Sequence, residues 1–313
     1  MSLRIRQPGV LSLLQDRGRF GQHHLGLTTG GPMDLEAFLL CQRLLGNSAD
    51  CTLLECSFGG LEVEVNIDTL LCVTGADAPL LINGKPADLW TTHRVREGDR
   101  VQLGHPQQGC RNYLGVVDGF QVAPQFGSTA TVLREGIGGL RGEKLAPDDV
   151  LPCRSDTQRP RLRLPPAERP HYAGQLTVRV VPGYQQQHFD RLQQRRFYSA
   201  AWSVSQRADR MGYRLEGPVI RCDIAGIVSE GICLGAIQVP ADGQPIVLLN
   251  DRQTIGGYPK LGSAISIDAS RMSQLRPGGT VHFAAVSPHA AHNALHMHHW
   301  RLQHLPLQPL PEE

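Results

Sequence analysis

The chain has 313 residues, of which 41% are hydrophobic and 19% charged, so it can bury a sizeable core and does not belong to the disordered class. Lysine and arginine number 31 against 29 aspartates and glutamates, a balance that gives no electrostatic basis for binding nucleic acid or an anionic membrane. No uncharged apolar run approaches the ~18 residues of a membrane span, and the first residues lack the apolar stretch of a signal peptide. The eight cysteines are scattered and form no CxxC pair. We therefore expect a cytoplasmic protein with free thiols and no structural zinc.

Short strands dominate the first half of the chain. Thirty-four glycines and 22 prolines indicate many turns, which favours short strands over a helix bundle. Apolar and polar residues alternate most clearly in LEVEVNI, the typical pattern of a half-buried strand. One helix is predicted over 30–47, because Pro32 stands just inside its start and Gly46 at its end. Strands are predicted at 61–67, 70–75, 78–83, 100–104 and 112–119.

A segment rich in proline and arginine, 153–174, is predicted to be a linker between two domains. After it we predict a strand in LTVRVVPG and a helix over 185–197. Further strands are predicted at 213–216, 226–230, 233–239, 245–250, 263–267 and 280–286. Because so many short strands must protect their edges, each half is expected to close as a β-barrel. The prediction is a mainly β protein of two β-barrel-like domains, 1–152 and 175–288, with a few short helices and a His- and Pro-rich tail at 289–313.

Three segments place polar residues among glycines and prolines. In the first, 13–34, glycines allow a tightly folded loop that carries Asp16 and Arg19 and leads into a helix start at Asp34. A helix N-terminus that follows glycines can bind an anion, so these three residues are candidates for substrate binding. The alternative is that Asp16 and Arg19 pair with each other and only hold the loop.

The second segment, 205–218, has three arginines around Asp209, namely Arg207, Arg210 and Arg214. Guanidinium groups suit carboxylates and phosphates, although a solvated salt-bridge cluster is an equal alternative.

The third segment, 229–262, clusters polar residues at a strand end beside a glycine turn, where sites commonly lie. Asp251 could accept a proton or orient an N–H group of a ligand, and Lys260 offers a cation. The alternative is that these polar residues only form turns. The other candidates in this segment are Glu230, Gln244, Asn250, Gln253 and Tyr258.

Several familiar motifs are missing: the sequence has no GxxxxGK[ST] loop, no HExxH and no GxSxG. The string GIGGLRG at 136–142 lacks the GxGxxG spacing and is predicted to be a turn in a β domain. Four histidines, His289, His292, His296 and His299, would share one face of a helix. No carboxylate or cysteine completes a ligand set there, so we predict no metal site.

Long strings in these segments resemble the KipA family, also called the allophanate hydrolase subunit 2 family, which includes the C-type subunits of 5-oxoprolinase and is biotin-dependent-carboxyltransferase-like. They include QPGVLSLLQDRGRFGQHHLGLTTGGPMD, VTGADAPLLING, VSQRADRMGYRLEGP and SEGICLGAIQVPADGQPIVLLNDRQTIGGYPKL, and the resemblance runs from about residue 3 to 288. The chain departs from the family pattern in YLGVVDGFQ at 113–121 and in STATV at 128–132, where Ala130 stands in place of an aspartate.

The resemblance implies a cyclophilin-like β-barrel and a subunit of an ATP-dependent 5-oxoprolinase, which converts 5-oxoproline to L-glutamate. It implies a KipI-type partner, with a LamB/YcsF-type subunit opening the phosphorylated lactam, and ATP with Mg bound at the partner interface. Arg210, Arg214 and Lys260 then fit the cations of the site, with Asp251 or Glu230 near the lactam N–H. Two alternatives use the same surface. One is a urea or amide carboxyltransferase subunit served by biotin on a carrier domain, and the other is a non-catalytic antagonist of a KipI-type kinase inhibitor.

Overall fold

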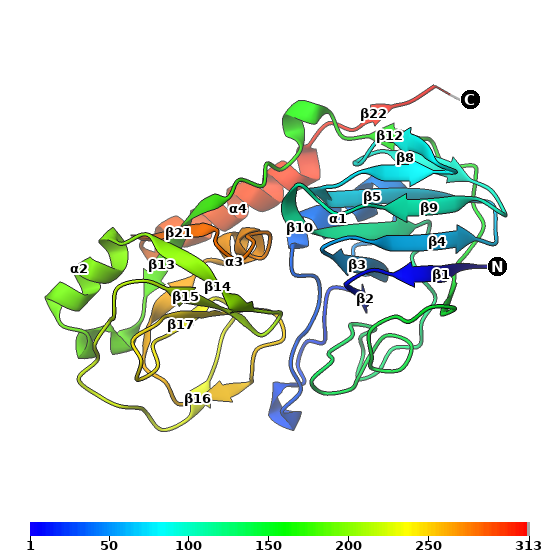
Figure 1. The fold of residues 1–313 in the computed structure, drawn as a ribbon. Coiled ribbons are helices and arrows are strands. Elements are labelled where there is room, and N and C mark those ends of the chain that lie inside the picture. The colour runs from blue at the N-terminus through cyan, green and yellow to red at the C-terminus, as the bar shows by residue number, and fades with distance from the viewer. Residues whose placement is uncertain (312–313) are drawn as a thin grey trace. The chain divides into compact units, whose positions relative to one another are not determined.

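The computed structural model describes residues 1–311, which form two compact units. Unit 1 contains Met1–Gly21, Thr29–Tyr172 and the chain from His304 onward, and unit 2 contains Gln22–Thr28 and Ala173–Gln303. Strands predominate in both units, which confirms the expectation of a mainly β protein (Figure 1). Within residues 1–311, no helix is both long enough and apolar enough to cross a membrane.

Unit 1 is built from two antiparallel sheets that share one core. The inward residues of both sheets, such as Val63 of β4 and Val73 of β5, are completely buried in the same apolar cluster. In this unit the strands form two facing sheets, whereas the sequence predicted a single closed barrel. The first sheet has the order β11 (Val150–Pro152), β1 (Ser2–Pro8), β4 (Leu61–Val65), β9 (Arg100–Leu103), β6 (Leu80–Ile82) and β7 (Lys85–Ala87). The second has the order β2 (Leu11–Gln15), β3 (Leu53–Ser57), β10 (Gln108–Val116), β5 (Thr69–Asp77) and β8 (Thr92–Val95).

One helix, α1 (Leu35–Leu45), packs on β5 and β10. It begins where the carboxylate of Asp34 accepts a hydrogen bond from the Ala37 amide at 3.1 Å, as an N-cap residue does. It ends at Gly46, whose φ of +67° is the left-handed conformation that glycine adopts without strain. The predicted helix over 30–47 is therefore present, but its first residues form the turn that leads into it.

Unit 2 is a closed barrel of seven strands, which confirms the barrel expectation for the second half (Figure 1). The barrel order is β13 (Gln175–Pro182), β20 (Lys260–Ala264), β17 (Ala236–Gln238), β18 (Ile246–Leu248), β15 (Gly212–Glu216), β14 (Trp202–Ala208) and β21 (Thr280–Ala285). A separate pair joins β16 (Glu230–Gly231) to β19 (Ile255–Gly256). The helices of this unit are α2 (Arg191–Ser199), α3 (Ser266–Met272) and α4 (Pro288–His304), with short 3-10 turns at η1 (His23–Leu25) and η3 (Tyr184–His188).

Some elements of the second half differ from the prediction. The helix predicted over 185–197 is divided into η3 and α2, because Asp190 caps the second piece by accepting from the Gln193 amide at 2.9 Å. The strand predicted at 226–230 is reduced to the two-residue β16, and the second half of the strand predicted at 263–267 begins α3. The glycine string 136–142 forms turns, as expected.

The chain from Cys153 onward follows a different course from the predicted linker and tail. Leu164 is completely buried, and β12 (Leu162–Arg163) pairs with β22 (Gln308–Pro309). The 3-10 turn η2 (Pro166–Glu168) follows β12. Residues 289–313 were predicted to be a His- and Pro-rich tail beyond the second domain, and within the described residues α4 and β22 form most of this segment. A guanidinium nitrogen of Arg43 also donates to the Leu305 carbonyl at 3.1 Å, so the end of the described chain is part of unit 1.

Candidate active site in the barrel unit

A cavity of about 250 Å³ opens in unit 2 beside the ends of β13, β16 and β20. Two predicted catalytic residues, Glu230 and Lys260, line it. They come from parts of the chain that lie 30 residues apart, and the pairing of β16 with β19 and of β20 with β13 holds them in position. The remaining lining residues are Val181, Pro182, Gly183, Tyr184, Gln185, Gly231, Cys233, Gly262 and Ser263.

The polar groups of this cavity form one connected cluster around Glu230. The ammonium of Lys260 and the hydroxyl of Tyr184 both donate to the Glu230 carboxylate. The Gln185 side chain donates to Glu230 Oε1 at 3.0 Å and accepts from the Lys260 backbone amide at 2.9 Å. Gln185 therefore fixes the separation between β16 and β20, while Lys260 and Glu230 face the cavity.

These hydrogen bonds set the charges of the cluster. The bonds from Lys260 and then from Tyr184 lower the pKa of Glu230, so that this carboxylate is ionised at neutral pH. The same bond to Glu230 raises the pKa of Tyr184, whose hydroxyl stays protonated. The cavity thus presents an ammonium donor and a carboxylate acceptor side by side, which suits an amide group that offers both a carbonyl and an N–H.

A close backbone contact beside the cavity requires a glycine at position 262. A Cβ on Gly262 would lie 2.5 Å from the carbonyl oxygen of Val181, on the neighbouring strand β13. Gly183 follows β13 directly and donates its amide to the Leu261 carbonyl at 2.9 Å. A side chain on Gly262 would therefore separate β13 from β20, the two strands between which the cavity opens, whereas a Cβ on Gly183 would lie 3.3 Å from Gly262 Cα.

Arg210 and Asp251, the other two predicted catalytic residues, are held elsewhere in unit 2. Arg210 Nε lies 2.8 Å from Asp251 Oδ2 and Arg210 Nη2 lies 3.0 Å from Asp251 Oδ1, a bidentate ion pair. Both side chains are only 6% exposed, and neither lines the cavity. The structure therefore pairs these two residues with each other, and it does not bring them into the cavity that Lys260 and Glu230 line.

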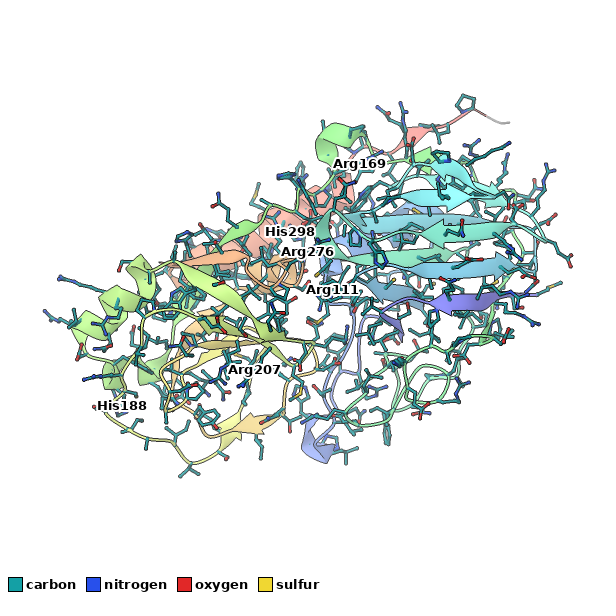
Figure 2. The ribbon with its side chains drawn as sticks, viewed as in Figure 1. Arg111, Arg169, His188, Arg207, Arg276 and His298 are labelled. Atoms are coloured by element: carbon teal, nitrogen blue, oxygen red, sulfur yellow. The ribbon has the colours of Figure 1, made fainter. Side chains whose placement is uncertain are left out.

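The remaining candidates of the second and third segments are dispersed over unit 2. Arg214 forms an ion pair with Asp242 at the surface, and the Gln244 amide brackets Gly217 by bonding to its N–H at 2.9 Å and its carbonyl at 3.2 Å. The backbone carbonyl of Asn250 accepts from Thr28. Three others are exposed and lie outside the cavity: Arg207 on β14 (Figure 2), Gln253 and Tyr258.

Asp16, Arg19 and Asp34 organise the first loop of unit 1. Asp16 accepts from the Ser128 hydroxyl at 2.6 Å and the Thr129 amide at 2.7 Å, and Arg19 donates to the carbonyls of residues 125, 128 and 130. Asp16 thus bonds to the 125–130 segment and not to Arg19, although both hold the loop as the alternative hypothesis expected. Asp34 caps α1 and accepts from the Tyr172 hydroxyl at 2.8 Å.

The sequence analysis missed the other residues of the cavity with hydrogen-bonding side chains, namely Tyr184, Gln185, Cys233 and Ser263. The rule that identified the third segment could have found the first two, because they directly follow a glycine at the end of β13. The helix predicted over 185–197 concealed that signal. Within residues 1–311, no three His, Cys, Asp or Glu side chains come together as a metal-binding group.

The chain offers no cradle for a triphosphate in its glycine string. The amides of Gly138, Gly139 and Gly142 already donate to Gln125 Oε1, the Thr129 carbonyl and the Gly138 carbonyl, at 3.0, 2.8 and 2.7 Å. A Cβ on Gly138 would lie 1.9 Å from the Ala130 carbonyl oxygen, so its glycine serves internal packing. These residues do not fit ATP, whose phosphates need unoccupied amides and cations.

Comparison with known proteins places the chain among carboxyltransferase domains. Residues 25–285 match the family described as "Carboxyltransferase domain, subdomain A and B". The chain is 35% identical over 288 residues to the C subunit of 5-oxoprolinase from Escherichia coli, covering 91% of each chain. It is 33% identical to the C subunit of 5-oxoprolinase from Haemophilus influenzae, covering 88% of each. The crystal structure of K. lactis urea amidolyase contains the same fold, with a TM-score of 0.92 at 23% identity over 100% of this chain and 20% of that one.

The two bacterial relatives match along almost their whole length, whereas the urea amidolyase contains this fold as one part of a much longer chain. The match to the family extends from the first polar loop to β21 and includes the whole cavity cluster. This chain belongs to the carboxyltransferase domain family, subdomains A and B.

Proposed function

We propose that this chain is a subunit of an ATP-dependent 5-oxoprolinase that works with a KipI-type partner in the cytoplasm. The observation that carries the proposal is the similarity to two proteins named as the C subunit of 5-oxoprolinase, at 33–35% identity over about nine-tenths of each chain. The barrel cavity supports it chemically, because its cluster suits a small amide.

In this proposal the cavity binds the lactam through Lys260 and Glu230. A five-membered lactam holds its amide in the cis form, so its C=O and N–H groups lie on the same edge of the ring. The Lys260 ammonium would donate to the carbonyl oxygen, and the ionised Glu230 would accept from the N–H. Gln185 and Tyr184 would act as positioning residues, since each bonds to Glu230. A fixed donor at the carbonyl oxygen stabilises negative charge that develops there.

The nucleotide is assigned to the partner side of the complex. The glycine string of this chain has its amides occupied, and Lys260 is already paired with Glu230. We therefore expect the isolated chain to bind ATP and Mg weakly and to hydrolyse ATP slowly. A LamB/YcsF-type subunit would complete the complex by opening the ring.

The experiment is an ATPase assay with 5-oxoproline, with and without a cognate KipI-type subunit. We expect stimulation only with the partner, and a loss of ~10-fold or more in the stimulated rate for Lys260→Ala and for Glu230→Gln, since one charged contact to a developing charge contributes ~2–4 kcal/mol. Lys85→Ala, an exposed lysine of β7 in unit 1, is the matched control and should keep the full rate. Full activity of both cavity variants would contradict the site assignment.

The second candidate is a urea or amide carboxyltransferase subunit that uses biotin on a carrier domain. The family description and the 0.92 TM-score to a urea amidolyase favour it. The two functions differ in one readout: transfer of a carboxyl group from carboxybiotin to an amide, without lactam-stimulated ATP hydrolysis, would establish the carboxyltransferase. Binding of a KipI-type protein with neither activity would leave the antagonist role.

A further inference from the structure

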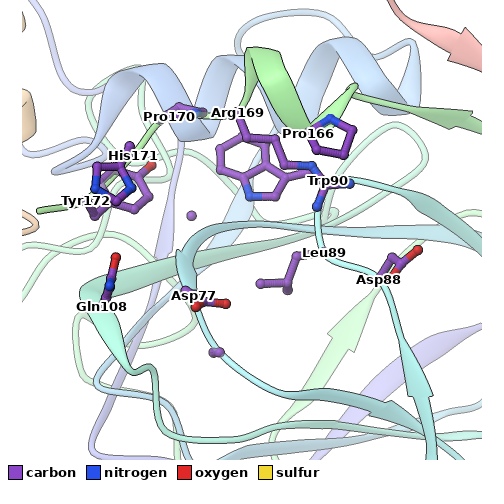
Figure 3. A pocket seen from close by; sticks show the side chains of 12 residues that line it. Asp77, Asp88, Leu89, Trp90, Gln108, Pro166, Arg169, Pro170, His171 and Tyr172 are labelled. Atoms are coloured by element: carbon purple, nitrogen blue, oxygen red, sulfur yellow. The ribbon is translucent and has the colours of Figure 1, made fainter.

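Unit 1 contains a second, larger cavity that the proposed function does not use. Its volume is about 450 Å³, within the range of roughly 300–1,000 Å³ that small-molecule sites occupy. Its walls come from the end of β5, the turn before β8, the start of β10 and the segment after η2 (Figure 3). The lining residues are Gly75, Asp77, Ala78, Asp88, Leu89, Trp90, Gln108, Pro166, Arg169, Pro170, His171 and Tyr172.

Arg169 brings a cation to this cavity with most of its hydrogen-bonding capacity unused. Its Nε donates to the Leu164 carbonyl at 3.1 Å. Among residues 1–311, neither Nη1 nor Nη2 has a hydrogen-bond or ion-pair partner. The side chain is partly buried, and desolvation lowers the pKa of its guanidinium. A desolvated guanidinium with two free nitrogens is a receptor for a carboxylate or a phosphate through a pair of parallel bonds.

Trp90 supplies a second unused donor from the same wall. It is 3% exposed, and its indole Nε1 has no hydrogen-bond partner within the described chain. Its φ of +61° is rare for a bulky side chain and costs on the order of 1–3 kcal/mol, so surrounding contacts must hold it. Leu164 links the two residues through its backbone. Its amide donates to the Trp90 carbonyl at 2.9 Å, and its carbonyl accepts from Arg169. The two donors are therefore positioned by one chain of hydrogen bonds before any ligand arrives.

The cavity also contains two carboxylates, Asp77 and Asp88, that the guanidinium does not reach. Asp88 is close enough to interact electrostatically with Arg169, yet no ion pair forms within 4.0 Å. In the part of the chain that the structure describes, neither side-chain carboxylate has a hydrogen-bond partner. Opposite charges that line one cavity without pairing are complementary to a ligand that carries both charges.

We propose that this cavity is a binding site for a zwitterion of the α-amino-acid class. The ligand carboxylate lies on the Nη groups of Arg169, and the ammonium faces Asp77 and Asp88. Trp90, Leu89 and the two prolines form the apolar wall for the ligand side chain. The cavity contains one guanidinium and two carboxylates, so an acidic ligand side chain would be repelled. Amino acids with neutral side chains therefore bind better than those with acidic ones. The site lies in unit 1 and does not depend on the function proposed for the barrel cavity.

The test is isothermal titration of the full chain with L-leucine and L-glutamine, and with three analogues. N-acetyl-L-leucine lacks the ammonium, L-leucinamide lacks the carboxylate, and L-glutamate adds a negative charge. We expect the first two ligands to bind and each analogue to bind ~10-fold or more weakly, as expected for loss of one charge-assisted bond. Equal binding of N-acetyl-L-leucine would replace the zwitterion by a simple anion and overturn the proposal, and so would no heat of binding for any probe at millimolar concentration.

Variants locate the site. Arg169→Gln should lose the binding ~10-fold or more, and Trp90→Phe should remove the ligand-induced change in tryptophan fluorescence, because Trp90 is the tryptophan that lines the cavity. Arg96→Gln removes the same charge from an exposed position of unit 1 and should bind like the parent. An unchanged melting temperature excludes misfolding of the Arg169 variant. Unchanged affinity in Arg169→Gln would place any binding elsewhere and refute the assignment.

Discussion

The buried pair Arg210–Asp251 gives the sharpest test of how charge is used in the barrel. Both side chains are 6% exposed and share two hydrogen bonds of 2.8 and 3.0 Å. Removing one partner of such a pair leaves the other charge buried, which typically costs ~3–5 kcal/mol of folding free energy. With a urea m-value of ~2–3 kcal/mol/M, Asp251→Ala should lower the midpoint of unfolding by ~1–2 M.

The assay is urea unfolding followed by tryptophan fluorescence, to which Trp202 in β14 of the same unit contributes. Arg210→Ala should cost a similar amount, since it leaves the Asp251 carboxylate buried. The double variant should cost less than the sum of the two single variants by ~2–3 kcal/mol, because neither charge is then left behind. The surface pair formed by Arg214 and Asp242 is the control, and its coupling should be ~1 kcal/mol or less.

The catalytic hypothesis for Asp251 makes the opposite forecast. If Asp251 acts on the substrate, Asp251→Ala should retain the parent midpoint and lose the lactam-stimulated ATPase. That combination would refute the stabilising role derived from the ion pair and return Asp251 to the active site.

Three further outcomes follow from the structure. Deleting the chain from Leu305 onward should lower the melting temperature of unit 1 by several degrees. The reason is that burial of this leucine contributes ~1.5–3 kcal/mol and that the deletion also removes β22. An unchanged melting temperature would contradict this expectation. Thiol titration of native protein should modify Cys233 first, because it is the exposed cysteine, and denatured protein should show eight thiols; a specific disulfide would contradict this. The folded pKa of Glu230 is lowered, so its contribution to stability is present above the unfolded value and is lost as pH falls through the folded one. The stability difference between the parent and Glu230→Gln should therefore be constant from pH 8 to ~5 and shrink below ~4.5, and a difference that changes near neutral pH would contradict the assigned charge.

The sequence predicts secondary structure well where apolar residues recur with the period of one element or where capping residues mark its ends. The alternation in LEVEVNI matches β4, whose burial alternates residue by residue, and the helix signals at Asp34 and Gly46 correspond to a real N-cap and C-cap. Both features depend on neighbours along the chain, so a local pattern contains the information. The divided helix at Asp190 shows the same principle, since a capping aspartate inside the predicted helix marked its true start.

Long-range pairings account for most of what sequence reasoning missed. Nothing local indicates that β12 pairs with β22, which lies about 145 residues further along, and so the 153–174 segment resembled a linker. Long-range pairing of strands also determines which charged side chains form ion pairs with each other. Asp251, Lys260 and Glu230 share one polar segment, but the barrel places Asp251 against Arg210 and leaves the other two at a cavity.

Burial and partner together decide what each arginine of this chain does, and Arg→Lys substitutions test that rule. Lysine keeps the charge but loses the planar fork, so its effect depends on how many bonds the fork makes. At Arg210 the fork bonds to one buried carboxylate, and the lysine variant should lose folding stability. At Arg169 the fork makes only the bond from Nε to the Leu164 carbonyl, so the lysine variant should lose ~1 kcal/mol at most, less than Arg210→Lys, and should lose affinity for an amino acid. At the surface position Arg214, the lysine variant should change neither. If Arg169→Lys were destabilising to the same degree as Arg210→Lys, the guanidinium of Arg169 would be structural and the second cavity would have no free cation to offer.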